Sequence, residues 1–354
     1  MKFSYKNKKI TGVLAVIPKN FKTFDEEMEN YQADKARIKR LKIVMGYEKH
    51  HIVEEGVTVS DLAVFGMEYL FKNNLLKPEE ISALVLVTES PDHFLPPTSN
   101  IIQGRLNLST DIFCIDINQG CAGYIVGLME AFSLLEQPDM KKIVLINADI
   151  LSRKTCKEDR NSYPLVGDAI SITIVENFAE NVLIQGEIKM DGSRADVLMI
   201  PAGGFKMPST PETAIIREDK DGNRRSLNNL VMQGREVFHF VQTEVPPLIF
   251  DLLNRLKITK NDIDWYLFHQ PNKFMVEKLA EEMGIPYEKI PSNIVTNFGN
   301  ASGVTVPLNM TFNLGEKLLN STFKVCLAGF GVGLTWGSMI IEIGNFNFCK
   351  IIDF

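Results

Sequence analysis

Two halves of this 354-residue chain repeat one pattern of apolar segments at a constant shift of 182 positions. The segment 81–88 (ISALVLVT) is matched by 263–269 (IDWYLFH), and the segment 142–147 (KIVLIN) is matched by 324–329 (KVCLAG). Each is a short, mostly apolar run, which is typical of a buried strand. One chance match would mean little, but two pairs at the same shift indicate that the chain duplicates a single structural unit.

Two further pairs of segments extend the repeat. Residues 121–129 (CAGYIVGLM) and 301–310 (ASGVTVPLNM) both place small residues ahead of an apolar helical run, and closing strands are predicted at 169–175 and 337–343. Strands that alternate with helices form βαβ units, so we expect a mostly parallel sheet in each half. The fold class is therefore predicted to be α/β.

We expect the chain to divide into an N-terminal half at 1–180 and a C-terminal half at 181–354. The segment 190–228 is rich in glycine, proline and charge, which is typical of loops or of a lid over a site. The segment 230–256 then has the apolar spacing of a helix, and the pair Pro246–Pro247 predicts a kink or break within it.

The composition excludes several classes of protein. With 44 acidic and 38 basic residues the formal charge is −6, which excludes a globally basic nucleic-acid binder. No apolar run approaches the ~20 residues that a membrane span needs, and the first ten residues lack the apolar core of a signal peptide. The five scattered cysteines fit neither a disulfide framework nor a zinc site. We therefore expect a soluble, cytoplasmic enzyme without a metal.

Cys121 lies at the junction between a predicted strand at 112–117 and a predicted helix. The positive end of the helix dipole favours a thiolate, the reactive form of cysteine, and the small neighbours Gly120, Ala122 and Gly123 leave room for a substrate. On position alone, the alternative is a small buried packing residue.

The other four cysteines give weaker indications of chemistry. Cys114 and Cys326 lie on apolar, strand-like segments and are predicted to serve packing. Cys156 lies beside lysines and is expected at or near the surface. Cys349, near the C-terminus, has no evident chemical role.

Two polar residues of the C-terminal half are further candidates. His269 ends a predicted strand, and in α/β folds the carboxyl ends of strands border the binding sites. Asn300 lies in the tight turn NFGNAS, where asparagine and glycine tolerate unusual backbone angles. Taken alone, His269 is equally consistent with a hydrogen-bonded core histidine, and Asn300 with a turn residue.

The run at 329–337 (GFGVGLTWG) looks like a phosphate-binding loop, but a strand is predicted after it where such a loop needs a helix N-terminus. We therefore reject dinucleotide binding. The free backbone N–H groups of such a turn could instead form part of an oxyanion hole. His50 and His51, followed by Glu54 and Glu55, have no metal-ligand spacing and are predicted to be solvated.

Several of these segments follow one another in a specific order. The order along residues 40 to 345 is the Cys121 junction, Gly167–Asp168, 234–238 (GREVF), 269–272 (HQPN), 299–302 (GNAS) and 330–337 (FGVGLTWG). In this combination they resemble the beta-ketoacyl-ACP synthase III family of the thiolase-like superfamily. The resemblance implies a duplicated αβαβα fold and a homodimer.

The resemblance also implies a chemistry. Cys121 would take an acyl group from a thioester, usually acyl-CoA. His269 and Asn300 would stabilise the enolate that forms when malonyl-ACP loses CO₂, and the carbanion would then attack the acyl-Cys121 thioester. The backbone N–H groups of Cys121 and Val332 would hold the oxyanion. The product would be a 3-oxoacyl-ACP of fatty acid biosynthesis, with no cofactor beyond the phosphopantetheine thioesters of acyl-CoA and acyl carrier protein.

Four further residues match positions at which this family contacts its substrate. Asn272, Gly234 and Phe238 are predicted to bind the substrate. Leu95 matches a position that reaches across the dimer and lines the acyl pocket of the partner. The length of the acyl chain would then depend on both copies.

Two departures from the family concern the acyl donor. Members commonly place a tryptophan, which stacks on the CoA adenine, in the segment matching 40–46, and this chain has none there. Phe274 stands where a basic residue is frequent. An acyl-ACP donor is therefore credible, and Lys42, Arg235 and Lys273 are candidates for contacting an acidic carrier protein.

Glu89 departs from the family in a way that bears on the reaction. A glutamate after this strand is similar to the general base of HMG-CoA synthases and of some specialised condensing enzymes. If Glu89 faces Cys121, it could serve a non-decarboxylating condensation; otherwise it is a surface carboxylate at the end of a strand. The two remaining alternatives are a catalytically silent partner subunit and a thiol protease.

Overall fold

The computed structural model describes residues 1–31, 34–180 and 182–354 and contains two large sheets. The six-stranded sheet has the order β17 (Phe348–Asp353), β2 (Lys8–Ile17), β8 (Ala169–Asn177), β7 (Lys142–Asp149), β5 (Ala83–Val87), β6 (Phe113–Ile117). The five-stranded sheet has the order β1 (Lys2–Lys6), β9 (Leu183–Met190), β16 (Thr335–Gly344), β15 (Thr322–Gly331), β14 (Trp265–Phe268).

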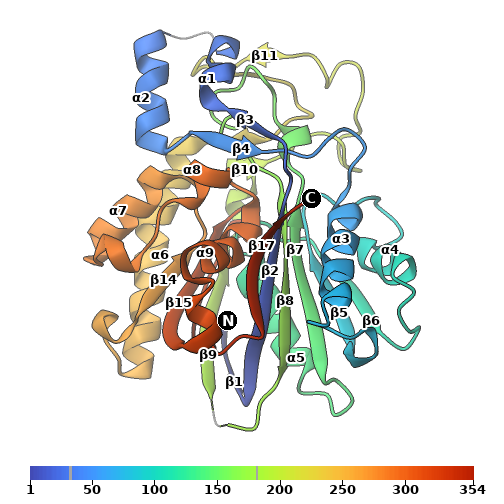
Figure 1. Cartoon of the computed structure of the whole chain (residues 1–354). Helices are drawn as coiled ribbons and strands as arrows, with labels where there is room; N and C mark the ends of the chain where they lie inside the picture. The colour runs from blue at the N-terminus through green and yellow to red at the C-terminus, as the bar shows by residue number, and fades with distance from the viewer. Residues whose placement is uncertain (32–33, 181) are drawn as a thin grey trace.

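Helices separate and cover these sheets (Figure 1). The helices of the layers are α5 (Gly123–Leu134) and α9 (Thr305–Leu314) between the sheets, α3 (Val59–Lys72) and α4 (Thr98–Arg105) outside the six-stranded sheet, and α6 (Gly234–Leu256) and α7 (Lys273–Met283) outside the five-stranded sheet. The buried side chains of α5 and α9 pack in one cluster with strands of both sheets, which makes these helices the central layer. The predicted αβαβα layering is confirmed.

The internal repeat predicted from the sequence is visible in the sheets. The neighbouring strands β8, β7 and β5 correspond to β16, β15 and β14, and in both sets the first pairing is antiparallel and the second parallel. Each terminal strand joins the sheet formed mainly by the other half. The N-terminal β1 pairs with β9 in the five-stranded sheet, and the C-terminal β17 pairs with β2 in the six-stranded sheet. A division of the chain at residue 180 stays a prediction.

The expectation of a mostly parallel sheet in each half is wrong for the five-stranded sheet. There only the β14–β15 pairing is parallel, whereas the other three pairings are antiparallel. The glycine turn at 332–334 accounts for one of these three, because it joins β15 directly to β16 as a hairpin instead of a crossover.

Smaller elements connect the layers. They are β3 (Phe21–Thr23), α1 (Phe24–Glu27), α2 (Lys35–Met45), β4 (Lys49–His51), β10 (Leu198–Met199), β11 (Arg217–Glu218), β12 (Arg224–Arg225), β13 (Val231–Met232), α8 (Ile294–Phe298) and α10 (Lys317–Asn320). The segment 190–228 contains only short strands and one-turn helices between its loops, as expected. The helix α6 continues through Pro246 and Pro247 and does not break there.

Across residues 1–31, 34–180 and 182–354, no helix combines the length and the hydropathy that a membrane span requires.

Candidate active site

Cys121 lies between the two halves of the chain, just before α5. Gly331, the last residue of β15 in the other half, lies very close to it. A Cβ added to Gly331 would lie 2.5 Å from the Cys121 sulfur and 2.5 Å from the Cys121 Cβ. The backbone N–H of Val332, the next residue along the chain, lies near the sulfur and opposes the rise of its pKa. The sequence assigned these residues to one oxyanion hole, and the fold brings them together.

The thiol of Cys121 is neutral at rest. Burial and the nearby charge of Glu89 raise its pKa to about 12, against the opposing effect of hydrogen bonds from Val332 and from the Ser302 hydroxyl. The helix dipole was expected to favour a thiolate, but the effect of burial on the pKa outweighs the effect of the dipole. A reaction at this sulfur therefore needs a base that removes the proton as the attack takes place.

His269 follows β14 and is 1% exposed. Its Nδ1 lies 2.7 Å from Thr305 Oγ1 and 3.1 Å from the Ser302 carbonyl oxygen. Burial lowers the pKa of this imidazole to about 3, because no carboxylate compensates the loss of solvation. His269 is therefore a neutral hydrogen-bonding group at physiological pH and a weak proton acceptor.

Asn300 is fixed by its backbone at the meeting point of the halves. Its N–H donates to the Leu165 carbonyl oxygen at 2.7 Å, and its own carbonyl accepts the N–H of Gly167 at 3.1 Å. Gly167 allows this approach, since a Cβ there would lie 2.3 Å from the Phe298 carbonyl oxygen. The side-chain oxygen of Asn300 accepts the N–H of Ser302 at 2.9 Å.

Glu89 faces the interior of the site. Its carboxylate packs against Gly120, where an added Cβ would lie 2.1 Å from Oε2, and Oε2 accepts the Ser302 hydroxyl at 3.3 Å. Burial raises the pKa of Glu89 to about 7. The surface-carboxylate alternative is therefore wrong, since this side chain adjoins the residue before Cys121.

A second buried carboxyl group, that of Asp149, hydrogen-bonds with the backbone of Glu89. Asp149, at the end of β7, is 2% exposed and accepts the backbone N–H of Glu89 at 2.8 Å. Burial and the charge of Glu89 raise the pKa of Asp149 well above its usual value. Asp149 and Ser302 were not predicted as site residues from the sequence, although Ser302 ends the GNAS motif. A polar residue directly after an apolar strand was the available indication for Asp149.

The predicted substrate-binding residues are spread around this centre. The Asn272 side chain caps α7 by accepting the Met275 N–H at 2.9 Å. Phe238 stacks on Phe274 with ring centroids 5.5 Å apart. Gly234 begins α6 with open space at its Cα, and Leu95 is 79% exposed on its loop.

Three minor predictions are wrong. His50 and His51 are 2% and 8% exposed, not solvated. His50 hydrogen-bonds with Glu27 through Nε2 at 3.1 Å and with the Val166 carbonyl oxygen through Nδ1 at 2.6 Å. These contacts explain the burial of His50, because each of its ring nitrogens has a partner in the protein. His51 Nδ1 lies 2.7 Å from the Pro18 carbonyl oxygen. Cys156 is also buried, at 8% exposed.

No group of three or more His, Cys, Asp or Glu side chains within the described ranges has the arrangement of a metal site.

Comparisons with known proteins agree with the fold and with the motifs. The family model of 3-oxoacyl-[acyl-carrier-protein] synthase III matches residues 115–192, and the model of its C-terminal part matches residues 253–343. A beta-ketoacyl-[acyl-carrier-protein] synthase III of Clostridium perfringens is 31% identical over 339 residues, covering 96% of this chain and 100% of its own. One from Fusobacterium nucleatum is 30% identical over 335 residues, covering 94% and 98%.

One solved structure has a closely similar fold over the whole chain. The 3-oxoacyl-(acyl-carrier protein) synthase of Burkholderia xenovorans LB400 superposes with a TM-score of 0.92 at 29% identity and covers 100% of this chain and 99% of its own.

The contact between Cys121 and the glycine turn gives a first prediction. Replacing Gly331 by alanine should destabilise the protein by about 1–3 kcal/mol, because the new methyl group overlaps Cys121. It should also slow labelling of the Cys121 thiol. Chemical unfolding and alkylation kinetics measure the two effects.

Gly104→Ala is the matched control, since Gly104 lies in α4 with open space around its Cα. This control should be neutral or more stable by about 0.4–1 kcal/mol. Wild-type stability and labelling in Gly331→Ala would contradict the close contact.

Proposed function

The chain belongs to the 3-oxoacyl-[acyl-carrier-protein] synthase III family, and from this premise we propose that it joins an acyl group held on Cys121 to a malonyl unit on acyl carrier protein. It is a condensing acyltransferase of fatty acid biosynthesis. One observation carries the assignment of roles: Cys121 of the first half lies against the oxyanion donor Val332 and within one hydrogen-bonded cluster with His269 and Asn300.

The first step is acyl transfer. The Cys121 sulfur attacks the carbonyl carbon of an acyl thioester, and the thiol of CoA or of the carrier leaves with the proton. The N–H groups of Cys121 and Val332 stabilise the tetrahedral oxyanion. The position of the Val332 N–H near the sulfur supports this role, because the carbonyl must bind beside the sulfur. Loss of one such donor costs about 2.7–4 kcal/mol of barrier in other enzymes.

The second step is decarboxylation. His269 and Asn300 donate hydrogen bonds to the thioester oxygen of the malonyl group as CO₂ leaves and the enolate forms. A neutral His269 carries one ring N–H. It donates from Nε2 only when the Thr305 hydroxyl, whose oxygen lies 2.7 Å from Nδ1 and 2.9 Å from the Ser302 carbonyl oxygen, turns from that carbonyl to donate to Nδ1. The enolate carbon then attacks the acyl-Cys121 carbonyl, and the sulfur leaves as a thiolate that regains its proton.

We place Cys121→Ala as the second prediction. The variant should form no acyl-enzyme with an acyl thioester, because the accepting sulfur is gone, and should still decarboxylate malonyl-ACP slowly. Mass spectrometry detects the adduct and ¹⁴CO₂ release detects decarboxylation. Cys326→Ala, which removes a buried thiol on β15, is the control and should acylate normally. Stoichiometric acylation of Cys121→Ala at another residue would refute the assignment.

We further propose that the active form is a homodimer in the cytoplasm, where its thioester substrates are made. The edge strand β6 supports a dimer, because its apolar residues are partly exposed and one side of its backbone has no neighbouring strand in the sheet. Phe113 on this strand is 43% exposed. Phe94 and Leu95, 75% and 79% exposed, supply further apolar surface for a partner copy.

The acyl carrier protein is the proposed partner, and helix α2 is its proposed contact. Five of the eleven α2 residues are basic and none is acidic, in a chain of net charge −6. Ile43, 74% exposed, adds an apolar contact at its end. The helix ends at Gly46, which packs against Lys273 of α7, so α2 lies beside the segment that follows His269. Such a surface fits an acidic protein better than a nucleotide.

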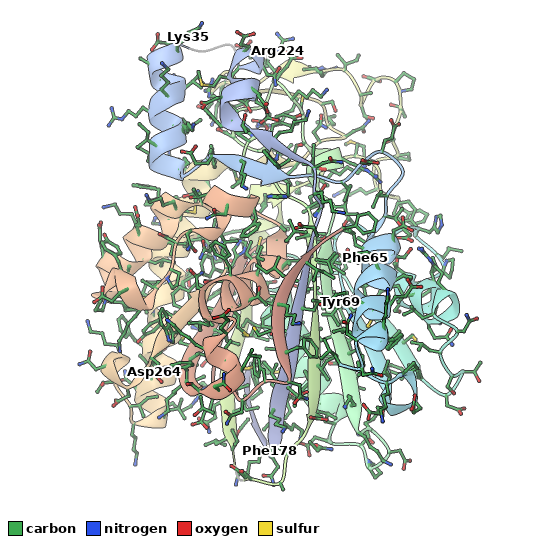
Figure 2. All side chains as sticks on the ribbon, viewed as in Figure 1. Lys35, Phe65, Tyr69, Phe178, Arg224 and Asp264 are labelled. Carbon is green, nitrogen blue, oxygen red and sulfur yellow. The ribbon has the colours of Figure 1, made fainter. Side chains whose placement is uncertain are left out.

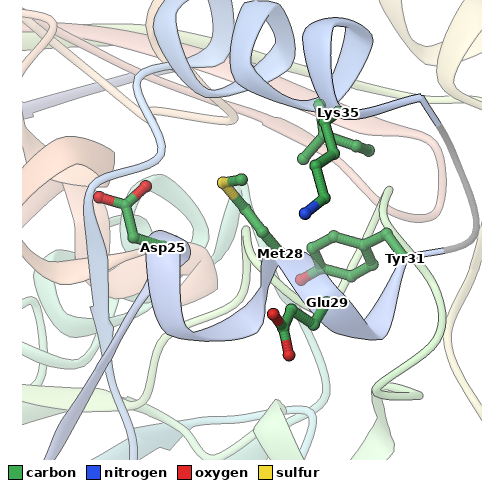
Figure 3. Close-up of a pocket in the computed structure, with 6 residues that line it drawn as sticks. Asp25, Met28, Glu29, Tyr31 and Lys35 are labelled. Atoms are coloured by element: carbon green, nitrogen blue, oxygen red, sulfur yellow. The ribbon is translucent and has the colours of Figure 1, made fainter.

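Among the described residues, Lys42 is the one α2 cation with an ion-pair partner. Of the predicted contacts, Lys42 is paired with Asp25 at 2.9 Å, whereas Arg235 is exposed at the start of α6. A pocket of about 350 Å³ lies between α2 and the segment that begins with Asp25, and Lys35 lines it (Figure 3). In Figure 2, Lys35 and Arg224 lie at one end of the molecule and Phe178 lies at the opposite end.

The third prediction tests this surface. The double variant Lys39→Glu/Arg40→Glu should raise the KM for malonyl-ACP by on the order of tenfold at low salt and leave kcat nearly unchanged, because rim charges act mainly on encounter. The difference should shrink as salt rises. Lys77→Glu is the control, since this exposed lysine precedes β5 and lies at the opposite end of that strand from Glu89. An unchanged KM would remove α2 from the docking surface.

Glu89 favours a second candidate function. A carboxylate with a pKa of about 7 beside the nucleophile is suited to removing a proton from the donor in a non-decarboxylating condensation. Extension with acetyl thioester would then proceed without CO₂.

The fourth prediction distinguishes the two functions by whether product formation releases CO₂. Purified protein acylated on Cys121 should extend malonyl-ACP with one CO₂ released per product, and should not extend an acetyl thioester. Product formation from the acetyl thioester that disappears in Glu89→Gln would establish the second function instead.

A further inference from the structure

Ser302 contacts every polar group of the proposed site. Its hydroxyl donates to Glu89 Oε2 at 3.3 Å and lies close enough to the Cys121 sulfur to oppose the rise of the pKa of that thiol. Its N–H donates to Asn300 Oδ1 at 2.9 Å, and its carbonyl oxygen lies 3.1 Å from His269 Nδ1. Among the described residues, only Ser302 hydrogen-bonds with Glu89, Asn300 and His269 together. Neither acyl transfer nor decarboxylation, as proposed, gives its hydroxyl a role.

The backbone of Ser302 is held in an unusual conformation that aims the hydroxyl. Its φ is +52°, in the left-handed region that residues with a Cβ rarely adopt. The residue is 4% exposed, and the Thr305 hydroxyl donates to its carbonyl oxygen at 2.9 Å. Strain of this kind is retained only where the surroundings fix it, and such positions cluster at functional sites.

We propose that the Ser302 hydroxyl relays the thiol proton of Cys121 to the carboxylate of Glu89 during acyl transfer. This inference rests on the proposed role of Cys121 as nucleophile. As the sulfur forms its bond to the acyl carbon, the S–H proton passes to Ser302 Oγ while the Ser302 O–H proton passes to Glu89. The bond from the acyl carbon to the carrier sulfur breaks, and that thiolate takes the proton from Glu89, so charge and protons balance.

His269 is a poor alternative acceptor for this proton. The Nδ1 of His269 is already engaged by Thr305 and Ser302, and the ring has a pKa of about 3, so it is a poor acceptor for a thiol proton. Glu89 is a much better match, since its pKa of about 7 lies near the working pH. Gly120 permits the approach, because any side chain there would displace the carboxylate.

The groups that face Glu89 determine how the relay responds to pH. They are Asp149 from β7, Cys121 from the junction before α5 and the Ser302 hydroxyl from the turn before α9. Asp149 disfavours a second charge beside it, so the two carboxyl groups titrate as a pair. Glu89 accepts a proton only when ionised. The rate of the Cys121 reaction should therefore rise with pH through about 7 in the wild type.

The experiment compares Ser302→Gly, Ser302→Ala and Glu89→Gln with the wild type, as full-length protein. Two rates are measured from pH 5.5 to 9: acylation of Cys121 by acetyl-CoA and by acetyl-ACP, and alkylation of Cys121 by iodoacetamide, which needs thiol deprotonation but no acyl substrate. Both Ser302 variants should be slower by about 100-fold, and all three should lose the inflection near pH 7. Glycine is favoured at φ +52°, so Ser302→Gly removes the hydroxyl without adding strain.

Ser338→Ala is the matched control. It removes another buried serine hydroxyl that contacts a cysteine, since Ser338 Oγ lies 3.4 Å from Cys326 Sγ on neighbouring strands. This variant should keep the wild-type rate and pH profile at Cys121. A merely structural role of Ser302 would lower stability without moving the inflection.

The outcomes separate the relay from the proposed function. Wild-type rates and profiles in Ser302→Gly, or a loss confined to Ser302→Ala, would overturn the relay while leaving Cys121 as the nucleophile. If no thioester acylates the wild type, the proposed function fails. In that case the alkylation profiles still decide the relay, which is supported if the inflection is lost in Ser302→Gly and overturned if it persists.

Discussion

The approach of the glycine turn to Cys121 is the contact on which the site depends. Gly331 lies so close to the sulfur that no side chain fits, and this brings the Val332 N–H near the sulfur. The turn joins two strands of one sheet, whereas Cys121 leaves the other sheet through α5. Two packed layers must therefore form before the proposed nucleophile and the proposed oxyanion donors meet. Neither half of the duplication contains all of the proposed site residues.

Burial then determines the charge states around that contact. It keeps the Cys121 thiol and the His269 imidazole neutral and leaves Glu89 close to half ionised at neutral pH. Neutral hydrogen-bond donors suit a reaction in which negative charge develops on an oxygen only in the transition state or a short-lived intermediate. It also means that the nucleophile is not activated in advance. The proposed relay through Ser302 supplies the missing proton transfer.

The sequence was sufficient for the parts of this arrangement that are local. Strands expected at 142–147 and 324–329 are β7 and β15, and their common shift predicted the duplicated layers. Pairing direction and the exchange of β1 and β17 between sheets were not predictable, because they depend on which distant strands meet. The burial of His50 was missed for the same reason, since its partners Glu27 and Val166 are remote in sequence. Glu89 could be named from its position, but only the fold shows that it faces Gly120.

The account makes Cys121 the acyl acceptor in a site shared by the two halves. The most direct test incubates the wild-type protein with a panel of acyl-CoA and acyl-ACP thioesters and maps the adduct by mass spectrometry of its peptides. One acyl group should appear on the peptide containing Cys121 and should be released as 3-oxoacyl-ACP when malonyl-ACP is added. An acyl group on a different residue, or one on Cys121 that malonyl-ACP never removes, would contradict the account.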